Sequence, residues 1–159
     1  EDNFVMGYAM GASVALGVSI LRPQLFCACL DISGGIGMTL QTSTMVEELS
    51  GDHFKKYMPS YHIAFGSPEE FPGSAYDLYP AAKRHKASGQ KLTDFILVCG
   101  SKEFIRKRVE DDAARLQELE YPVTYICVEG YDHDWKTWDE YTMRGLRELL
   151  PLKREYLYV

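Results

Sequence analysis

The sequence lacks the basic surplus that binding to a polyanion requires. Its 17 lysines and arginines stand against 23 aspartates and glutamates, which gives a formal net charge of -6. Nucleic acids and anionic membranes select proteins with clustered positive charge, and the basic residues here are scattered. The acidic start, Glu1-Asp2, also lacks the positive region of a signal peptide. We therefore expect no nucleic acid and no membrane as partners.

The chain also has few long uncharged runs, no internal repeats and no low-complexity segment. The run from Phe4 to Leu21 holds no charged residue, and its Gly7-x-x-x-Gly11 spacing also fits a membrane helix pair. This run is at the lower length limit for a membrane span, and its glycines suit a turn better. We predict a soluble protein, with 159 residues forming a single domain around one core.

The few cysteines lack the spacing of zinc ligands. Cys27, Cys29, Cys99 and Cys127 fall in apolar, strand-like runs, and Cys27 and Cys29 are placed on one face of a strand. We expect buried, reduced thiols, a reducing compartment such as the cytoplasm, and neither a metal nor an organic cofactor.

A serine is missing from the most informative stretch, Gly7-Tyr8-Ala9-Met10-Gly11. This stretch joins an expected strand at 3–6 to an expected helix at 12–21, which is the setting of the G-x-S-x-G nucleophile elbow. We expect glycine at both ends because Cβ atoms there would collide with neighbouring backbone. Ala9 stands where the motif has serine, and a methyl group cannot attack a carbonyl carbon.

The rest of the chain alternates between strand and helix patterns. We expect strands at 26–32, 94–99 and 123–128, and helices at 77–86, 105–120 and 135–150, the last capped by Asp134. Such alternation is typical of a parallel sheet with helices on both faces. The section 36–92 is interpreted as an insertion, or lid, within the single domain 1–159.

Three suspect residues follow expected strands, where parallel sheets bind their ligands. They are Ala9, Glu103 and His133. A nucleophile position followed by an acid and then a histidine is the order of the triad along the chain in α/β-hydrolases. An exposed glutamate favoured by a helix dipole is the alternative interpretation of Glu103. The remaining histidines, His53, His62 and His85, are interpreted as surface or packing residues, with His53 or His62 as alternative pocket residues. Trp135 and Trp138 are expected to pack the last helix.

With these residues in place, the sequence resembles α/β-hydrolases of the esterase D and tributyrin esterase group, which includes feruloyl and acetyl esterases. The resemblance covers nearly the whole chain and rests on Gly7-Tyr8-Ala9-Met10-Gly11, Ser33-Gly34-Gly35, FGSPEEF at 65–71, VCGSKEF at 98–104 and HDWKTW at 133–138. It implies that Ala9 is at the nucleophile position, Glu103 is the triad acid, His133 is the general base and Met10 supplies one oxyanion-hole N–H. The family usually has aspartate where this chain has Glu103.

The resemblance implies a carboxylic-ester hydrolase for short-chain or aryl acyl esters, inactive as written because of Ala9. A natural pseudo-hydrolase that binds a small ligand, or a structural subunit, is the alternative. The family has several strands before the elbow, so we expect this chain to be the C-terminal half of the α/β-hydrolase fold. The partner would be an N-terminal half in a separate chain, or a second copy of this chain, covering the strand at 3–6.

Overall fold

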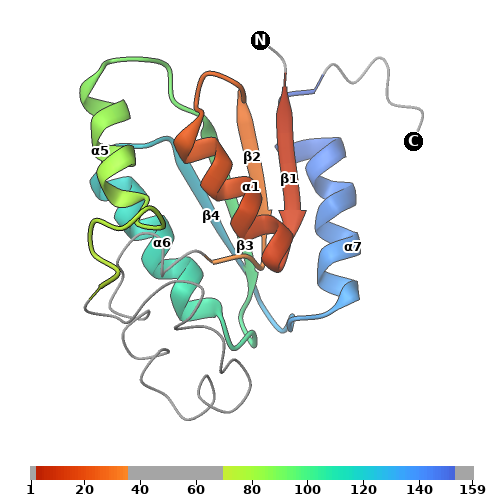
Figure 1. Ribbon diagram of the computed structural model, residues 1–159. Coiled ribbons are helices and arrows are strands. Elements are labelled where there is room, and N and C mark those ends of the chain that lie inside the picture. Colours follow the sequence, from red (N-terminus) through yellow and green to blue (C-terminus); the bar gives the residue numbers. More distant parts are fainter. Residues whose placement is uncertain (1–2, 36–69, 153–159) are drawn as a thin grey trace.

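The computed structural model describes residues 3–35 and 70–152. They form a four-stranded parallel sheet in the order β1-β2-β3-β4, and each strand is followed along the chain by a helix (Figure 1). The strands are β1 (Phe4–Tyr8), β2 (Ala28–Ile32), β3 (Asp94–Gly100) and β4 (Val123–Val128). The helices are α1 (Met10–Leu21), α5 (Tyr79–Ala87), α6 (Arg106–Glu118), α7 (Trp135–Arg144) and the π-helical turn η1 (Gly145–Leu149).

The burial of each strand follows its place in the sheet. The central strand β2 is buried at all five positions, and β3 is buried everywhere except at Asp94. These two strands read as continuous apolar runs because helices cover both of their faces. The outer strands β1 and β4 are only partly buried, and β1 pairs with β2 alone among the described residues.

Helices lie on both faces of the sheet, as expected. One core packs α1, α5 and α6 against the β2 and β3 side chains Cys29, Phe95, Leu97 and Cys99. The other packs α7 and the chain after it against Leu30, Ile32, Ile96 and Val98. Among the described helices, α7 lies on one face of the sheet, and α1, α5 and α6 lie on the other (Figure 1).

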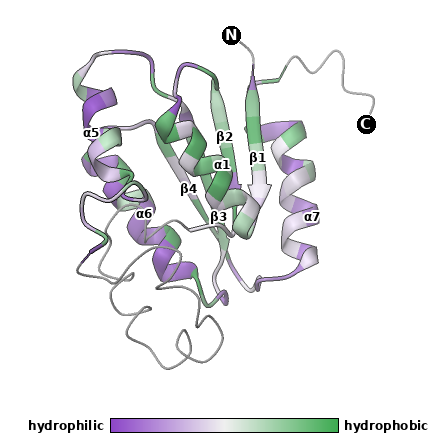
Figure 2. Ribbon diagram, in the orientation of Figure 1, coloured by the Kyte–Doolittle hydropathy of each residue, from purple (hydrophilic) through white to green (hydrophobic). Residues whose placement is uncertain are grey.

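Helix α1 differs from the others in having no charged residue. It is hydrophobic along most of its length, whereas α5, α6 and α7 carry many hydrophilic positions (Figure 2). Its inner side is buried at Ala12, Leu16 and Ile20, yet Met10 is 81% exposed and Val14 is 70% exposed. An apolar outer face of this kind is typical of a helix that packs against a further element.

The last helix differs from its prediction as one α-helix over 135–150. Asp134 does cap it, since its carboxylate accepts the Thr137 N–H at 3.0 Å. The α-helical bonding ends at Arg144, however, and the chain continues as the π-helical turn η1. At Gly145 an added Cβ would meet the end of the Leu30 side chain, so the helix approaches the sheet closely and a larger residue there would require Leu30 to move.

Other boundaries shift by a few residues. β1 runs two residues beyond the expected strand 3–6, and β2 begins at Ala28 rather than at residue 26. Of the expected insertion, residues 36–69 lie outside the described residues, together with His53 and His62, while 70–92 contain α5. None of the described helices has the length and apolarity to cross a bilayer.

The prediction of four buried thiols is wrong in part. Cys29 and Cys99 are buried, Cys27 is half-buried and Cys127 is exposed, and all four are free of disulfides. Cys127 is exposed because β4 is an outer strand of the sheet, with less helix cover than β2 and β3. Burial raises the pKa of the Cys29 and Cys99 thiols well above their usual range, which keeps both neutral.

Candidate active site

The turn between β1 and α1 places Ala9 in a backbone conformation that alanine rarely adopts. Its φ is 51° and its ψ is -128°. The Ala9 N–H donates to Ile32 O at 3.0 Å, and its carbonyl accepts the Ala12 N–H at 3.0 Å. A non-glycine residue in such a region costs on the order of 1–3 kcal/mol and is found mainly at functional sites.

The two glycines of the turn have different roles. A Cβ on Gly7 would lie 2.5 Å from the Gly11 carbonyl carbon and oxygen, so glycine is required there. A Cβ on Gly11 would meet no described atom within 4 Å. Among the described residues, the expected collision is therefore correct for Gly7 and wrong for Gly11, which lies in the first turn of α1.

This difference gives a matched pair of variants. Gly7→Ala should destabilise the protein by about 3 kcal/mol, because the collision is with backbone that cannot rotate away. Gly11→Ala should leave stability unchanged or raise it by roughly 0.5–1 kcal/mol, because alanine favours the helix. Chemical denaturation of both variants measures the two effects. Equal losses would contradict the geometry of the turn.

Glu103 and His133 come together at the same end of the sheet. His133 Nδ1 lies 2.8 Å from Glu103 Oε2, although the two residues are 30 positions apart. The Glu103 side chain is 0% exposed and the His133 side chain is 21% exposed. The alternative interpretation of Glu103 as an exposed residue at a helix start is wrong. A buried carboxylate at Nδ1 fixes the orientation of the ring and leaves the other ring nitrogen, Nε2, available to accept a proton.

Two further donors hold the Glu103 carboxylate. Its Oε1 accepts the Ser33 hydroxyl at 2.7 Å and the Gly100 N–H at 2.7 Å. These donors come from the ends of β2 and β3, so the carboxylate is anchored by rigid elements. A buried charge is tolerated when hydrogen bonds of this kind satisfy its oxygens.

The loop that carries His133 is held from both sides. At its start, a Cβ on Gly100 would lie 2.3 Å from Tyr131 O, so the loop crosses the end of β3 at close range. At its end, Asp134 caps α7, and the N–H of Thr137 lowers the pKa of the Asp134 carboxyl. The Thr137 hydroxyl also donates to Asp132 O at 2.6 Å.

Aromatic rings connect the β1–α1 turn to the His133 loop. Tyr8, beside Ala9, stacks on Trp138 with centroids 5.1 Å apart. The same Trp138 ring meets His133 edge-on at 5.1 Å, and Phe104 meets His133 at 5.1 Å. Trp138 therefore packs as expected, but it does so between the elbow and the histidine. Trp135 contacts Tyr8 and Trp138 and is 67% exposed, so it is not a buried packing residue.

The structure places all four sequence-predicted site residues at one end of the sheet. Glu103 and His133 are in direct contact. Ala9 is bonded to the end of β2, and Met10 is the first residue of α1, where helix geometry leaves the N–H without an intrahelical acceptor. Ser33 is not among the predicted site residues, although its hydroxyl donates to the Glu103 carboxylate.

A second acidic side chain lies under this site and was also missed. Asp31 is buried in β2, where its Oδ1 accepts the Gly34 N–H at 2.8 Å. Burial, opposed in part by the hydrogen bond from Gly34, raises the pKa of Asp31 to about 7, and the charge of Glu103 adds to the rise. The available signal was a carboxylate within the apolar run Phe26 to Ile32, which has no place in an ordinary core strand.

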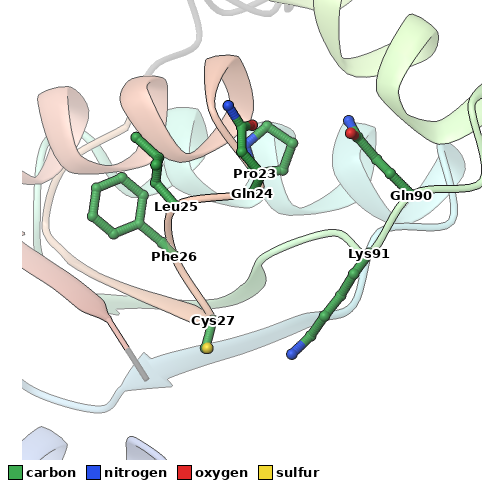
Figure 3. Close-up of a pocket in the computed structure, with 7 residues that line it drawn as sticks. All are labelled: Pro23, Gln24, Leu25, Phe26, Cys27, Gln90 and Lys91. Atoms are coloured by element: carbon green, nitrogen blue, oxygen red, sulfur yellow. The ribbon is translucent and has the colours of Figure 1, made fainter. Parts of the chain in front are cut away.

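A separate hollow lies at the opposite end of the sheet. It has a volume of about 490 Å³ and is lined by residues 23–27 and 90–91. Figure 3 shows that these side chains come from the loops that precede β2 and β3. The hollow is therefore distinct from the Glu103–His133 end.

The comparisons with known proteins give structural matches only. No protein-family model matches the chain, and no curated protein matches it in sequence. A fluorophosphonate-binding serine hydrolase from Staphylococcus aureus superposes with a TM-score of 0.71 at 17% identity, over 94% of this chain and 55% of that one.

Two other solved structures match in the same way. The S-formylglutathione hydrolase of Staphylococcus aureus gives a TM-score of 0.63 at 18% identity, over 93% of this chain and 51% of that one. A ferulic acid esterase gives 0.57 at 18% identity, over 92% of this chain and 48% of that one. The chain thus spans about half the length of these structures. Together with the parallel sheet, these matches show that the chain has a partial α/β-hydrolase fold.

Proposed function

We propose that this chain carries the catalytic edge of a carboxylic-ester hydrolase of the esterase D type, and that Ala9 makes it inactive as written. The observation that carries the proposal is the 2.8 Å contact between His133 Nδ1 and the buried Glu103, at the same end of the sheet as the strained Ala9 turn. The relation of the fold to serine hydrolases and esterases adds support.

The proposed reaction assigns one role to each residue. A hydroxyl at position 9 would attack the ester carbonyl, with His133 Nε2 taking its proton and Glu103 holding the ring through Nδ1. The Met10 N–H, the first of α1, would stabilise the oxyanion. The tetrahedral intermediate would collapse to an acyl-enzyme as His133 gives the proton to the departing alcohol, and water deprotonated by the same histidine would then hydrolyse the acyl-enzyme and release the acid. With Ala9 in place, the first step has no nucleophile.

The proposed substrate is a short-chain or aryl acyl ester. Three aromatic side chains stand around His133 and the turn, with Tyr8 40% exposed, Phe104 70% exposed and Trp135 67% exposed. Exposed rings beside a base can hold a flat acyl or alcohol group by stacking. The chemistry needs no metal or organic cofactor.

The proposed partner completes the sheet beyond β1. β1 is bonded on one side within the described residues, and the neighbouring α1 has an apolar outer face at Met10 and Val14. We propose that an N-terminal half of the fold, or a second copy of this chain, covers this surface and supplies the second oxyanion donor. A stable monomer of the 159 residues in light scattering, with β1 amides unprotected from hydrogen exchange, would contradict this pairing.

The inactive state can be tested directly on the protein as it is. Release of p-nitrophenol from p-nitrophenyl acetate should be equal for the unmodified protein and for His133→Ala, because the base has no hydroxyl to activate. His85→Ala, a change on α5, is the matched control for any rate due to a solvent-accessible imidazole. A rate that falls only in His133→Ala would mean that the site is active without a serine.

A natural pseudo-hydrolase that binds an ester and leaves it intact is the second candidate. It is favoured by Ala9 itself, which retains the positive φ of the turn without providing a nucleophile. The two candidates differ in the response to a serine at position 9. Tight ester binding with no gain of hydrolysis would favour the binding protein.

A further inference from the structure

Asp31 is a buried ionisable group that the proposed reaction does not use. It is fully buried in β2, and its carboxyl lies so close to Gly34 that a Cβ there would meet Oδ2 at 2.4 Å and Ala12 Cβ at 2.7 Å. The carboxyl is thus enclosed between the sheet, the Gly34 turn and α1. Its Oδ2 has no hydrogen bond of good geometry in the described part of the chain, although the nearby Gly35 N–H also acts on the carboxyl and lowers its pKa.

The groups around Asp31 do not favour a second negative charge. β2 and β3 contribute the neutral thiols Cys29 and Cys99, and the loop after β3 contributes the Glu103 carboxylate. On the α1 side, the methyl group of Ala12 lies against the same Gly34 backbone position. The Arg108 side chain from α6 lies against Gly35, the next residue of the turn. An ionised carboxylate buried among such groups would be strongly destabilising.

The turn that Asp31 supports also carries the Ser33 hydroxyl. Ser33 has a φ of 58°, and its N–H donates to Val98 O at 2.8 Å. The next N–H, that of Gly34, donates to Asp31 Oδ1. Asp31 therefore helps to hold Ser33 in the strained conformation from which its hydroxyl reaches Glu103 Oε1 at 2.7 Å.

We propose that Asp31 is a positioning residue that the fold keeps as a neutral carboxylic acid. By accepting the Gly34 N–H it fixes the turn that holds Glu103, and by staying uncharged it leaves the negative charge opposite His133 to Glu103. Its importance for hydrolysis rests on the proposed function, whereas its protonation state does not.

The neutral state predicts a dependence of stability on pH. The pKa of Asp31 in the folded protein is about 7, above its ordinary value of 3.8. Between these values the folded state holds a proton that the unfolded chain has lost, so stability falls as pH rises through this window and levels off above it. Each pH unit within the window should lower the folding equilibrium constant about tenfold.

Asp31→Asn tests this in the whole protein. Asparagine keeps an acceptor for the Gly34 N–H but cannot ionise. Between about pH 5 and pH 7, the folding constant of the unmodified protein should fall about fiftyfold relative to that of Asp31→Asn. Asp94→Asn, at the one exposed position of β3, is the control and should retain the steep dependence. Equal pH dependence in the unmodified protein and Asp31→Asn would overturn the proposal.

Nuclear magnetic resonance gives a second measurement that does not depend on the variant folding. The Asp31 carboxyl carbon of the unmodified protein should titrate with a midpoint near 7, and a midpoint near the ordinary aspartate value would overturn the neutral state. The downfield His133 Nδ1–H resonance should persist in Asp31→Asn and be lost in a folded Asp31→Leu. Its persistence in Asp31→Leu would overturn the positioning role. Neither result depends on esterase activity.

Discussion

Ala9→Ser should raise the hydrolysis of p-nitrophenyl acetate or butyrate by the whole protein at least about 10⁴-fold, since this is the scale of loss when a serine hydrolase loses its nucleophile. The turn already has the positive φ that the motif imposes, and Glu103 already holds His133. The substitution adds one oxygen atom and changes no backbone requirement. The expected result is therefore a higher kcat with little change in KM.

Two controls separate nucleophilic catalysis from a change in the turn. Ala9→Gly removes the Cβ at a positive φ, so it should be more stable than the unmodified protein and equally inactive. Ala9→Ser combined with His133→Ala should lose nearly all of the gain, because the hydroxyl then has no base. A serine variant that folds, binds the ester and does not hydrolyse it would exclude the esterase proposal.

Glu103→Gln in the Ala9→Ser background should lower kcat by about 10⁴-fold, the scale found when a triad carboxylate is replaced by its amide. The carboxylate accepts from His133, Ser33 and Gly100, and an amide group cannot accept at both ends. The ring would then be held in the wrong tautomer, with its base nitrogen protonated. Steady-state kinetics on the two variants measures the loss.

Two further substitutions define what the carboxylate does. Glu118→Gln removes a carboxylate that is 66% exposed on α6, and it should leave kcat unchanged. Glu103→Asp keeps the carboxylate but shortens the side chain by one methylene. Its kcat should therefore lie between that of the Ala9→Ser protein and that of its Glu103→Gln variant. Full activity in a folded Glu103→Gln would mean that this buried group is structural only.

Much of this architecture could be predicted from local pattern. The strand Val123–Val128 was expected at its observed bounds, and Asp134 was expected as a cap, because both depend on neighbouring residues. The end of the last helix was not predictable in this way. It changes to a π-helical turn at Gly145, where the backbone approaches Leu30 of the sheet, and a residue so far away in the chain leaves no local signal.

The chain order of the candidate site residues could be predicted from the sequence, but the residues that hold Glu103 in place could not. Glu103 and His133 follow strands, and parallel strands bring their carboxyl ends to one edge, so their meeting follows from topology. The contributions of Ser33 and Asp31 depend on where a turn directs its hydroxyl and on what encloses a carboxyl. Both depend on tertiary contacts, and in a single sequence the only sign of them is a polar residue beside or within an apolar run.

The indole rings of this protein have a practical consequence. The chain has two tryptophans, and Trp135 and Trp138 both lie against Tyr8, with Trp138 also meeting His133. Its tryptophan fluorescence therefore originates from the rim between the elbow and the histidine. Emission intensity is a built-in optical probe of that rim, sensitive to quenching by any molecule that enters it, without an added dye or label.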